Sequence, residues 1–338
     1  MTNYSSALSS IAPARLKRSL SRLLQLVPRA FPSAHEGLPQ HNLAGTQVYP
    51  IGVNFHKVLA DAQKKKFASL RITSETPVAS IGSCFAEHFA AHMLKSGFNY
   101  PIHEPNAFNA SAEWGRVYTI PNLKQIVDYS FDPAYPVYVE QSAKGWFDPL
   151  REPSTPFYPT REAAESGIRA HRKASHSAFS TAGVIAITMG QNEGWRDASS
   201  GIVWASVPPA ECLRREPARY APERFSYAAN LELLSEALRS LLAANAQLRV
   251  ILTVSPVPSF ATFLDSDVIA RSFENKCILR TVVDSALAVD PARVFYFPSF
   301  ELVLCYNPTN YLADNRHVNG AVVESVFGMF DQTVLDRR

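Results

Sequence analysis

The length and composition of this chain, 338 residues with 46% hydrophobic and 19% charged side chains, are those of a soluble globular protein with a large core. A net charge of +3, from 33 basic and 30 acidic side chains, gives no strong field, so nucleic acid is not implied as a partner. No run of about eighteen apolar residues occurs, which argues against a transmembrane span. The four cysteines form no C-x-x-C pair, which disfavours a zinc site or a disulfide framework and favours the reducing cytoplasm.

Residues 1–50 are rich in serine, proline and basic side chains, and we expect them to be an N-terminal extension to a main domain at 51–338. Basic residues between 15 and 29 alternate with leucines at helical spacing, which is typical of a short amphipathic helix. Such a helix either contacts an anionic membrane surface peripherally or packs on the domain as a leader.

The first clear element of the main domain is a short apolar strand at 77–82 that ends in Gly82. Phe85, Phe89 and Met93 then recur at helical spacing, so a helix follows at once. This pattern predicts strand, tight turn and helix, with Ser83 at the turn.

Three further strands are expected at 183–190, 248–255 and 293–297, with helices before the last two at 230–246 and about 274–288. Continuous apolar strands of this kind suit a parallel sheet that is covered on both faces. The alternation predicts an α/β sandwich. A Pro- and aromatic-rich stretch with helical pieces at 122–129 and 161–179 predicts an insertion, at about 100–180, over the active face.

Ser83 is the first candidate for chemistry. A serine between a strand's carboxyl end and a helix start projects into the crevice where open α/β sheets bind ligands. The N–H groups of the first helical turn can stabilise an oxyanion there. The alternative is that Ser83 only caps the helix, which is a common role for serine at this position.

A second candidate is the Asp314-x-x-His317 pair in a polar loop before a helix at 321–330. An aspartate three residues before a histidine can orient the imidazole, which can then take the proton of a serine hydroxyl. Such pairs also occur by chance on solvated surfaces.

A third candidate is the turn Gly190-Gln191-Asn192-Glu193, which directly follows a buried strand. Glycine lets the backbone approach a ligand closely, and the Asn192 amide can donate to an oxyanion. A polar turn at the end of a strand is the alternative.

These segments resemble the GSCFA family. Five blocks carry the resemblance in the same order over residues 78–330, namely G-S-C-F-A at 82–86, T-M-G-Q-N-E-G-W at 188–195, T-V-S-P-V-P at 253–258, Y-F-P-S-F-E at 296–301 and D-x-x-H at 314–317. The family in turn resembles the SGNH (GDSL-like) hydrolases, which implies a three-layer α/β/α sandwich with a central parallel sheet.

The resemblance implies a role for each matching residue. Ser83 is the nucleophile, His317 its base and Asp314 the residue that orients His317. The implied oxyanion donors are the N–H of Ser83, the Asn192 side chain and a backbone N–H from a second block, for which Gly115 in G-R-V-Y-T is the best match. Two further residues, Gly190 and Glu193, are expected to line the substrate site or to hold the turn.

The implied reaction is hydrolysis of an O-acyl ester, with acetyl on a carbohydrate as the expected substrate and with neither a metal nor a cofactor. The alternatives are O-acyl transfer to a glycan by the same triad, and a non-catalytic binding module in polysaccharide or envelope biogenesis. We expect no metal at the His88 and His92 pair, which lies on one helix face without an evident third ligand. Cys84 is expected to be a buried structural thiol that points away from the site.

Overall fold

The computed structural model describes residues 55–106, 110–152, 155–304 and 310–336. The predicted extension at 1–50 and its amphipathic helix lie outside these ranges. The chain divides into two units, Met1–Val58 and Leu59–Arg338, and the second holds every element discussed below except the start of helix α2. Within the described ranges, no helix has the length and apolar character needed to cross a membrane.

The centre of the second unit is a sheet of four strands in the order β1-β4-β8-β9, with every neighbouring pair parallel. The strands are β1 (Val78–Gly82), β4 (Val184–Met189), β8 (Arg249–Val254) and β9 (Val294–Tyr296). Register aligns Ile81 with Ile187 and Ile187 with Leu252, so the apolar runs lie side by side. The predicted parallel sheet is confirmed.

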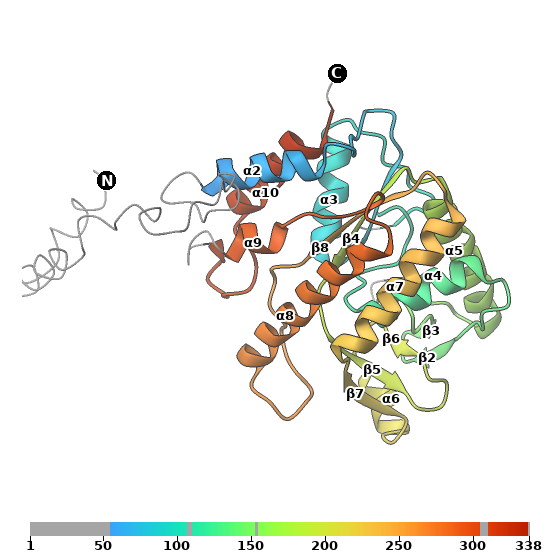
Figure 1. Cartoon of the computed structure of the whole chain (residues 1–338). Coiled ribbons are helices and arrows are strands. Elements are labelled where there is room, and N and C mark those ends of the chain that lie inside the picture. Colours follow the sequence, from blue (N-terminus) through green and yellow to red (C-terminus); the bar gives the residue numbers. More distant parts are fainter. Residues whose placement is uncertain (1–54, 107–109, 153–154, 305–309, 337–338) are drawn as a thin grey trace, which may run out of the picture. The chain divides into compact units, whose positions relative to one another are not determined.

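Helices cover both faces of this sheet (Figure 1). Ile81, Ile187 and Leu252 share one core cluster with side chains of helices α4, α5, α7 and α8. Val184 and Ile251 point to the other face and pack with α3, α9 and α10. Because both faces are buried, the strands carry apolar residues at nearly every position rather than at alternate ones. The three-layer α/β/α arrangement is confirmed.

Helices α3, α4, α5, α7 and α10 begin and end close to the predicted positions, α8 begins at Val268 rather than about 274, and α2, α6 and α9 were not predicted. Their bounds are α2 (Phe55–Lys66), α3 (Cys84–Lys95), α4 (Ile120–Phe131), α5 (Arg161–Thr181), α6 (Ala210–Arg215), α7 (Tyr227–Ala244), α8 (Val268–Ala286) followed by the 3-10 turn η3 (Leu287–Val289), α9 (Ser299–Leu304) and α10 (Gly320–Val334). Several starts are set by capping side chains, as at Thr160 and Ser226, whose hydroxyls accept from a backbone N–H of the first turn.

Two small antiparallel sheets were not predicted. One pairs β2 (Glu140–Ser142) with β3 (Gly145–Phe147), and the other has the order β6-β5-β7, from β6 (Val203–Trp204), β5 (Glu193–Asp197) and β7 (Tyr220–Arg224). Their strands of two to five residues carry mostly half-buried positions, so they lack the continuous apolar runs that marked the main sheet.

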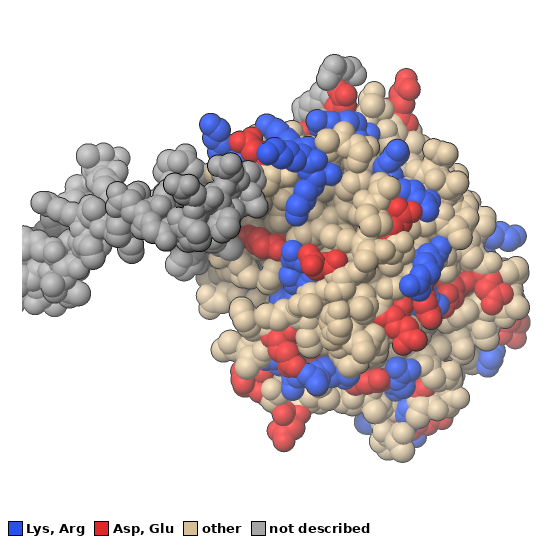
Figure 2. Space-filling model, in the orientation of Figure 1, with Lys and Arg blue, Asp and Glu red and all other residues tan. Residues whose placement is uncertain are grey.

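The segment expected as an insertion, about 100–180, contains α4, the β2–β3 hairpin and α5. Apolar side chains of α4 such as Leu123 and Ile126 are fully buried in the main core, so this helix belongs to the helical layer. Only the stretch at 116–119 borders the cavity described below. On the face seen in Figure 2, basic and acidic side chains are mixed and large areas are uncharged.

Candidate active site

A cavity of about 620 Å³ lies where three strands of the main sheet end. Ser83 follows β1, Gly190 follows β4 and Ser255 follows β8, and all three line it. The carboxyl edge of a parallel sheet is where ligands bind in open α/β folds. The start of β5, the loops after β6 and β8, the first turns of α3, the stretch at 116–119 and the loop before α10 form the remaining walls.

Ser83 lies at the floor of this cavity and is 2% exposed. It is the N-cap residue of α3, and its Oγ accepts a hydrogen bond from the N–H of Phe85 at 3.4 Å. The capping role and the position in the cavity therefore occur together. The positive end of the α3 dipole lies at this hydroxyl, which favours negative charge there.

Glycine is required at the residue before Ser83. Gly82 has φ 141°, and a Cβ there would lie 2.3 Å from the carbonyl oxygen of Thr188. The Ser83 N–H donates to the same oxygen at 3.1 Å, so the turn is held directly against β4. A Cβ on Gly190 would lie 3.2 Å from the Ser83 Cβ, so the two turns are in close contact.

Asp314 and His317 interact as the sequence predicts. Asp314 Oδ2 bonds to His317 Nδ1, and its Oδ1 accepts from the N–H groups of Arg316 and His317, each at 3.0 Å. The bond to His317, with these N–H groups, lowers the pKa of the Asp314 carboxyl to about 2. An ionised carboxylate cannot donate, so Nδ1 carries the proton and Nε2 is left as the acceptor.

His317 and Ser83 line the same cavity from opposite parts of the chain. The His317 side chain is 60% exposed, whereas Ser83 is buried. No hydrogen bond joins the two residues among the described contacts. The structure thus brings Ser83 and His317 to one cavity without a direct hydrogen bond between them.

The three expected oxyanion donors are placed differently. The Ser83 N–H, an expected oxyanion donor, donates to the carbonyl oxygen of Thr188 in the free protein. Gly115 has φ 66° and packs against Glu152, and it does not line the cavity. The Asn192 side chain is fully buried and accepts from Asn230 Nδ2 at 2.5 Å, and its own Nδ2 has no partner among the described residues.

Gly190 and Glu193 both line the cavity, and each fixes a wall. The Gly190 carbonyl accepts from Lys276 Nζ at 2.6 Å. The Glu193 carboxylate accepts from Thr262 Oγ1 and from the N–H of Phe263, each at 2.7 Å. Glu193 therefore holds the loop between β8 and α8 over the cavity.

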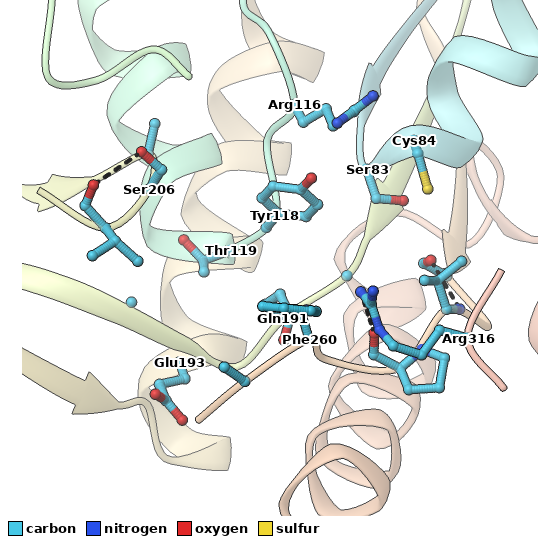
Figure 3. Close-up of a pocket in the computed structure, with 18 of the residues that line it drawn as sticks. Ser83, Cys84, Arg116, Tyr118, Thr119, Gln191, Glu193, Ser206, Phe260 and Arg316 are labelled. Carbon is cyan, nitrogen blue, oxygen red and sulfur yellow. Dashed lines mark hydrogen bonds between the residues drawn. The ribbon is translucent and has the colours of Figure 1, made fainter. Parts of the chain in front are cut away.

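Cys84 differs from its prediction. It is half-buried and lines the cavity beside Ser83, and Figure 3 shows the two side chains close together. Burial raises the pKa of its thiol, so it stays protonated near neutral pH and is a weak nucleophile.

The two histidines of α3 have separate environments. His92 bonds to Asp331 at 2.7 Å and stacks on Phe327, while His88 lines the cavity. In the described part of the chain, no three His, Cys, Asp or Glu side chains are grouped so as to hold a metal.

Sequence reasoning missed several lining residues. Aromatic side chains form one wall, from Trp195, Trp204 and Phe263, and Arg316 lies beside His317. Trp195 and Trp204 lie in strands of five and two residues, which are too short to show a periodic pattern of apolar residues in the sequence. The buried Lys276 left a usable signal, because it shares a helical face with Leu279 and Val283 at the i, i+3, i+7 spacing of buried positions.

The sequence model of the GSCFA family matches residues 77–330, which include every residue placed in the cavity. The chain belongs to the GSCFA family. In this GSCFA chain the motif that names the family is the end of β1 and the start of α3, with Ser83 between them.

A comparison with curated proteins finds no match. Among solved structures, this GSCFA chain is similar to the family 3 carbohydrate esterase of Clostridium thermocellum, with 7% sequence identity and a TM-score of 0.35. The similarity covers 78% of this chain and 94% of the esterase. A likeness at this level says nothing about the reaction.

Proposed function

We propose that this GSCFA chain is a serine hydrolase of the SGNH type that cleaves an O-acyl ester, with acetyl as the acyl group and a carbohydrate as the alcohol. The observation that carries the proposal is that Ser83, at a helix N-terminus, and His317, which bonds to Asp314, line one cavity. The order of these residues along the chain also resembles that of the SGNH hydrolases.

In the proposed reaction, the Ser83 hydroxyl attacks the ester carbonyl while His317 Nε2 takes its proton. His317 then gives that proton to the leaving alcohol, which leaves an acyl group on Ser83. A water molecule, deprotonated by His317, attacks the acyl-enzyme. The bond between the acyl carbon and Ser83 Oγ breaks, His317 returns the proton to Ser83 Oγ, and the carboxylic acid is released. Asp314 stays ionised throughout and stabilises the imidazolium, as its low pKa allows.

The proposal requires a hydrogen bond between Ser83 and His317 when substrate is bound. Catalytic contacts are often long in a free enzyme and shorten in the complex. The exposed loop of His317 can make this adjustment without moving the core. For the oxyanion, the α3 N-terminus supports the proposal, because its positive dipole end favours negative charge beside Ser83. The Asn192 amide is buried next to the lining residues Gln191 and Glu193 without lining the cavity itself, and its Nδ2 has no partner among the described residues, so we propose it as a donor that turns toward the oxyanion when substrate is bound.

The test is covalent labelling with a fluorophosphonate, followed by intact-mass analysis. One adduct per chain is expected, located at Ser83, because only a serine beside a base reacts at a useful rate. Ser83→Ala should abolish both labelling and 4-nitrophenyl acetate hydrolysis. Ser255→Ala is the matched control, since Ser255 is a buried serine in the same cavity whose hydroxyl accepts from the backbone N–H of Val257 and bonds to no histidine of the described residues.

Two results would contradict the proposal. Labelling at Cys84 would move the nucleophile by one residue and exclude the serine mechanism. A folded protein that neither labels nor hydrolyses any of a panel of short-chain esters would favour a binding module instead.

A further inference from the structure

Arg316 is a basic side chain of the cavity that the proposed reaction does not use. It lies next to His317 in sequence and lines the same cavity. Its Nη2 donates to the carbonyl of Pro258 at 3.3 Å, and its guanidinium lies 5.1 Å from the centre of the Phe260 ring. Figure 3 shows Arg316 beside Phe260.

Among the described residues, the other charged side chains of the cavity wall, and the Asp314 carboxylate that holds His317, already have partners. Arg116 pairs with Glu87 at 2.7 Å. Glu193 accepts from Thr262 and Phe263. Asp314 uses both carboxylate oxygens on the imidazole of His317 and on backbone N–H groups.

Arg316 forms no ion pair with any carboxylate of the described residues, and its Nε is buried without a partner there. Outside the described ranges the sequence contains one acidic side chain, Glu36. A half-buried guanidinium without a counter-ion, in a cavity, favours the binding of an anion. Its planar donor edge suits a carboxylate in particular.

The rest of the wall indicates what carries that anion. Phe260 covers the Arg316 guanidinium, and Trp195 and Phe263 pack edge to face with ring centres 5.1 Å apart. Apolar rings beside a single unpaired cation suit a ligand with an apolar face and one negative group. A sugar acid has both features.

We propose that Arg316 binds a carboxylate of the substrate, close to the ester that Ser83 attacks. The inference rests on the proposed function and names its substrate class, an ester that bears a carboxylate on the sugar or on the acyl group. Arg316 and His317 are neighbours in one loop, and both line the cavity. A carboxylate bound by Arg316 therefore lies close to the ester on which His317 acts.

The experiment compares kcat/KM for paired esters in wild type and Arg316→Gln. One pair is acetylated methyl glucuronide against acetylated methyl glucoside, and the other is mono-4-nitrophenyl succinate against 4-nitrophenyl acetate. Wild type should prefer the charged member of one pair. Arg316→Gln should reduce that preference by about 10- to 100-fold, the size of a charged hydrogen bond. The pair that responds shows whether the carboxylate belongs to the sugar or to the acyl group.

Arg161→Gln is the matched control, because Arg161 also lies over an aromatic ring, Trp146, and does not line the cavity. It should leave the preference of the wild type intact. Equal preference in wild type and Arg316→Gln for both pairs would overturn the inference and leave the hydrolase standing.

A second measurement does not depend on turnover. Binding of methyl glucuronide and of mono-methyl succinate to Ser83→Ala, with and without Arg316→Gln, is measured by calorimetry. The inference is supported if either anion binds Ser83→Ala more tightly than methyl glucoside does and if this difference disappears when Arg316→Gln is added. This result does not require that any ester is hydrolysed. Binding of neither anion, in a protein that hydrolyses neutral esters, overturns it.

Discussion

The two halves of the candidate triad are held in opposite ways. Ser83 is 2% exposed, and residues distant in sequence hold it in place. Its N–H donates to the carbonyl oxygen of Thr188, and it packs against the Gly190 turn, whose carbonyl accepts from Lys276. His317 is 60% exposed on its side chain and is fixed by Asp314, three residues away. The proposed nucleophile is thus part of the core, and the proposed base is part of a surface loop.

This difference separates stability from activity. A change near Ser83 disturbs buried contacts and should affect both the free energy of unfolding and the reaction. A change near His317 disturbs exposed side chains, which contribute little to stability, and should affect the reaction alone. The following variants test this comparison.

The largest expected effect is that of His317→Ala. Without the base, kcat for ester hydrolysis should fall by at least about 10³-fold. The melting temperature should stay within about 1 °C of wild type, because an exposed side chain is removed. Steady-state kinetics and a thermal melt check both parts, with His103→Ala, which lies outside the cavity, as control. A large drop in melting temperature would contradict the comparison.

Asp314→Asn should reduce kcat by up to about 10⁴-fold, less than the loss of His317 does. The amide can donate to His317 Nδ1, which favours the wrong tautomer and removes the charge that stabilises the imidazolium. Stability should again be unchanged. Rates measured from pH 5 to 9 should show the loss across the whole range, because the pKa of about 2 keeps Asp314 ionised throughout. A variant as active as wild type would remove Asp314 from the mechanism.

Asn192→Ala should reduce kcat by about 10²-fold if its Nδ2 donates to the oxyanion. It should also lower the free energy of unfolding by about 1 to 3 kcal/mol, because Asn230 loses a buried partner. Asn230→Ala is the matched variant and should destabilise similarly while it keeps the Asn192 amide. Equal kcat in both variants would show that Asn192 acts through packing.

The smallest activity effect is expected for Lys276→Met, roughly 10-fold or less through a looser Gly190 turn. Its main effect is on stability. Burial lowers the pKa of Lys276 from 10.5 to about 7, while the unfolded chain keeps the ordinary value. The unfolded state therefore binds more protons between these values, and wild-type stability gains with pH across this window.

The full cost of burying the charge is present below pH 7. Lys276→Met should consequently melt higher than wild type at pH 6, and the difference should shrink as the pH approaches 10. Thermal melts of both proteins across that range measure it. A difference that does not change with pH would mean that the amine keeps an ordinary pKa in the folded protein.

The sequence by itself determined the four strands of the main sheet, the longer helices around them and the Asp314–His317 pair. Apolar runs such as 184–189 and 249–254 predict buried parallel strands, because only a sheet covered on both faces buries every side chain. The helix after Gly82 follows from its 3.6-residue period. The Asp314–His317 contact was predictable because it spans three residues of one loop, so no other part of the chain decides it.

Only the tertiary structure decided the details around Ser83. The partner of its N–H is Thr188, the Asn192 side chain turns to Asn230, and Lys276 supports a carbonyl 86 residues away. Sequence spacing carries no information on such contacts, since they depend on how strands and helices pack. The same holds for Arg316. Only the positions of the described acidic side chains in the fold show that none of them pairs with its guanidinium. Local pattern sets which groups are present, and packing sets which of them remain free to act.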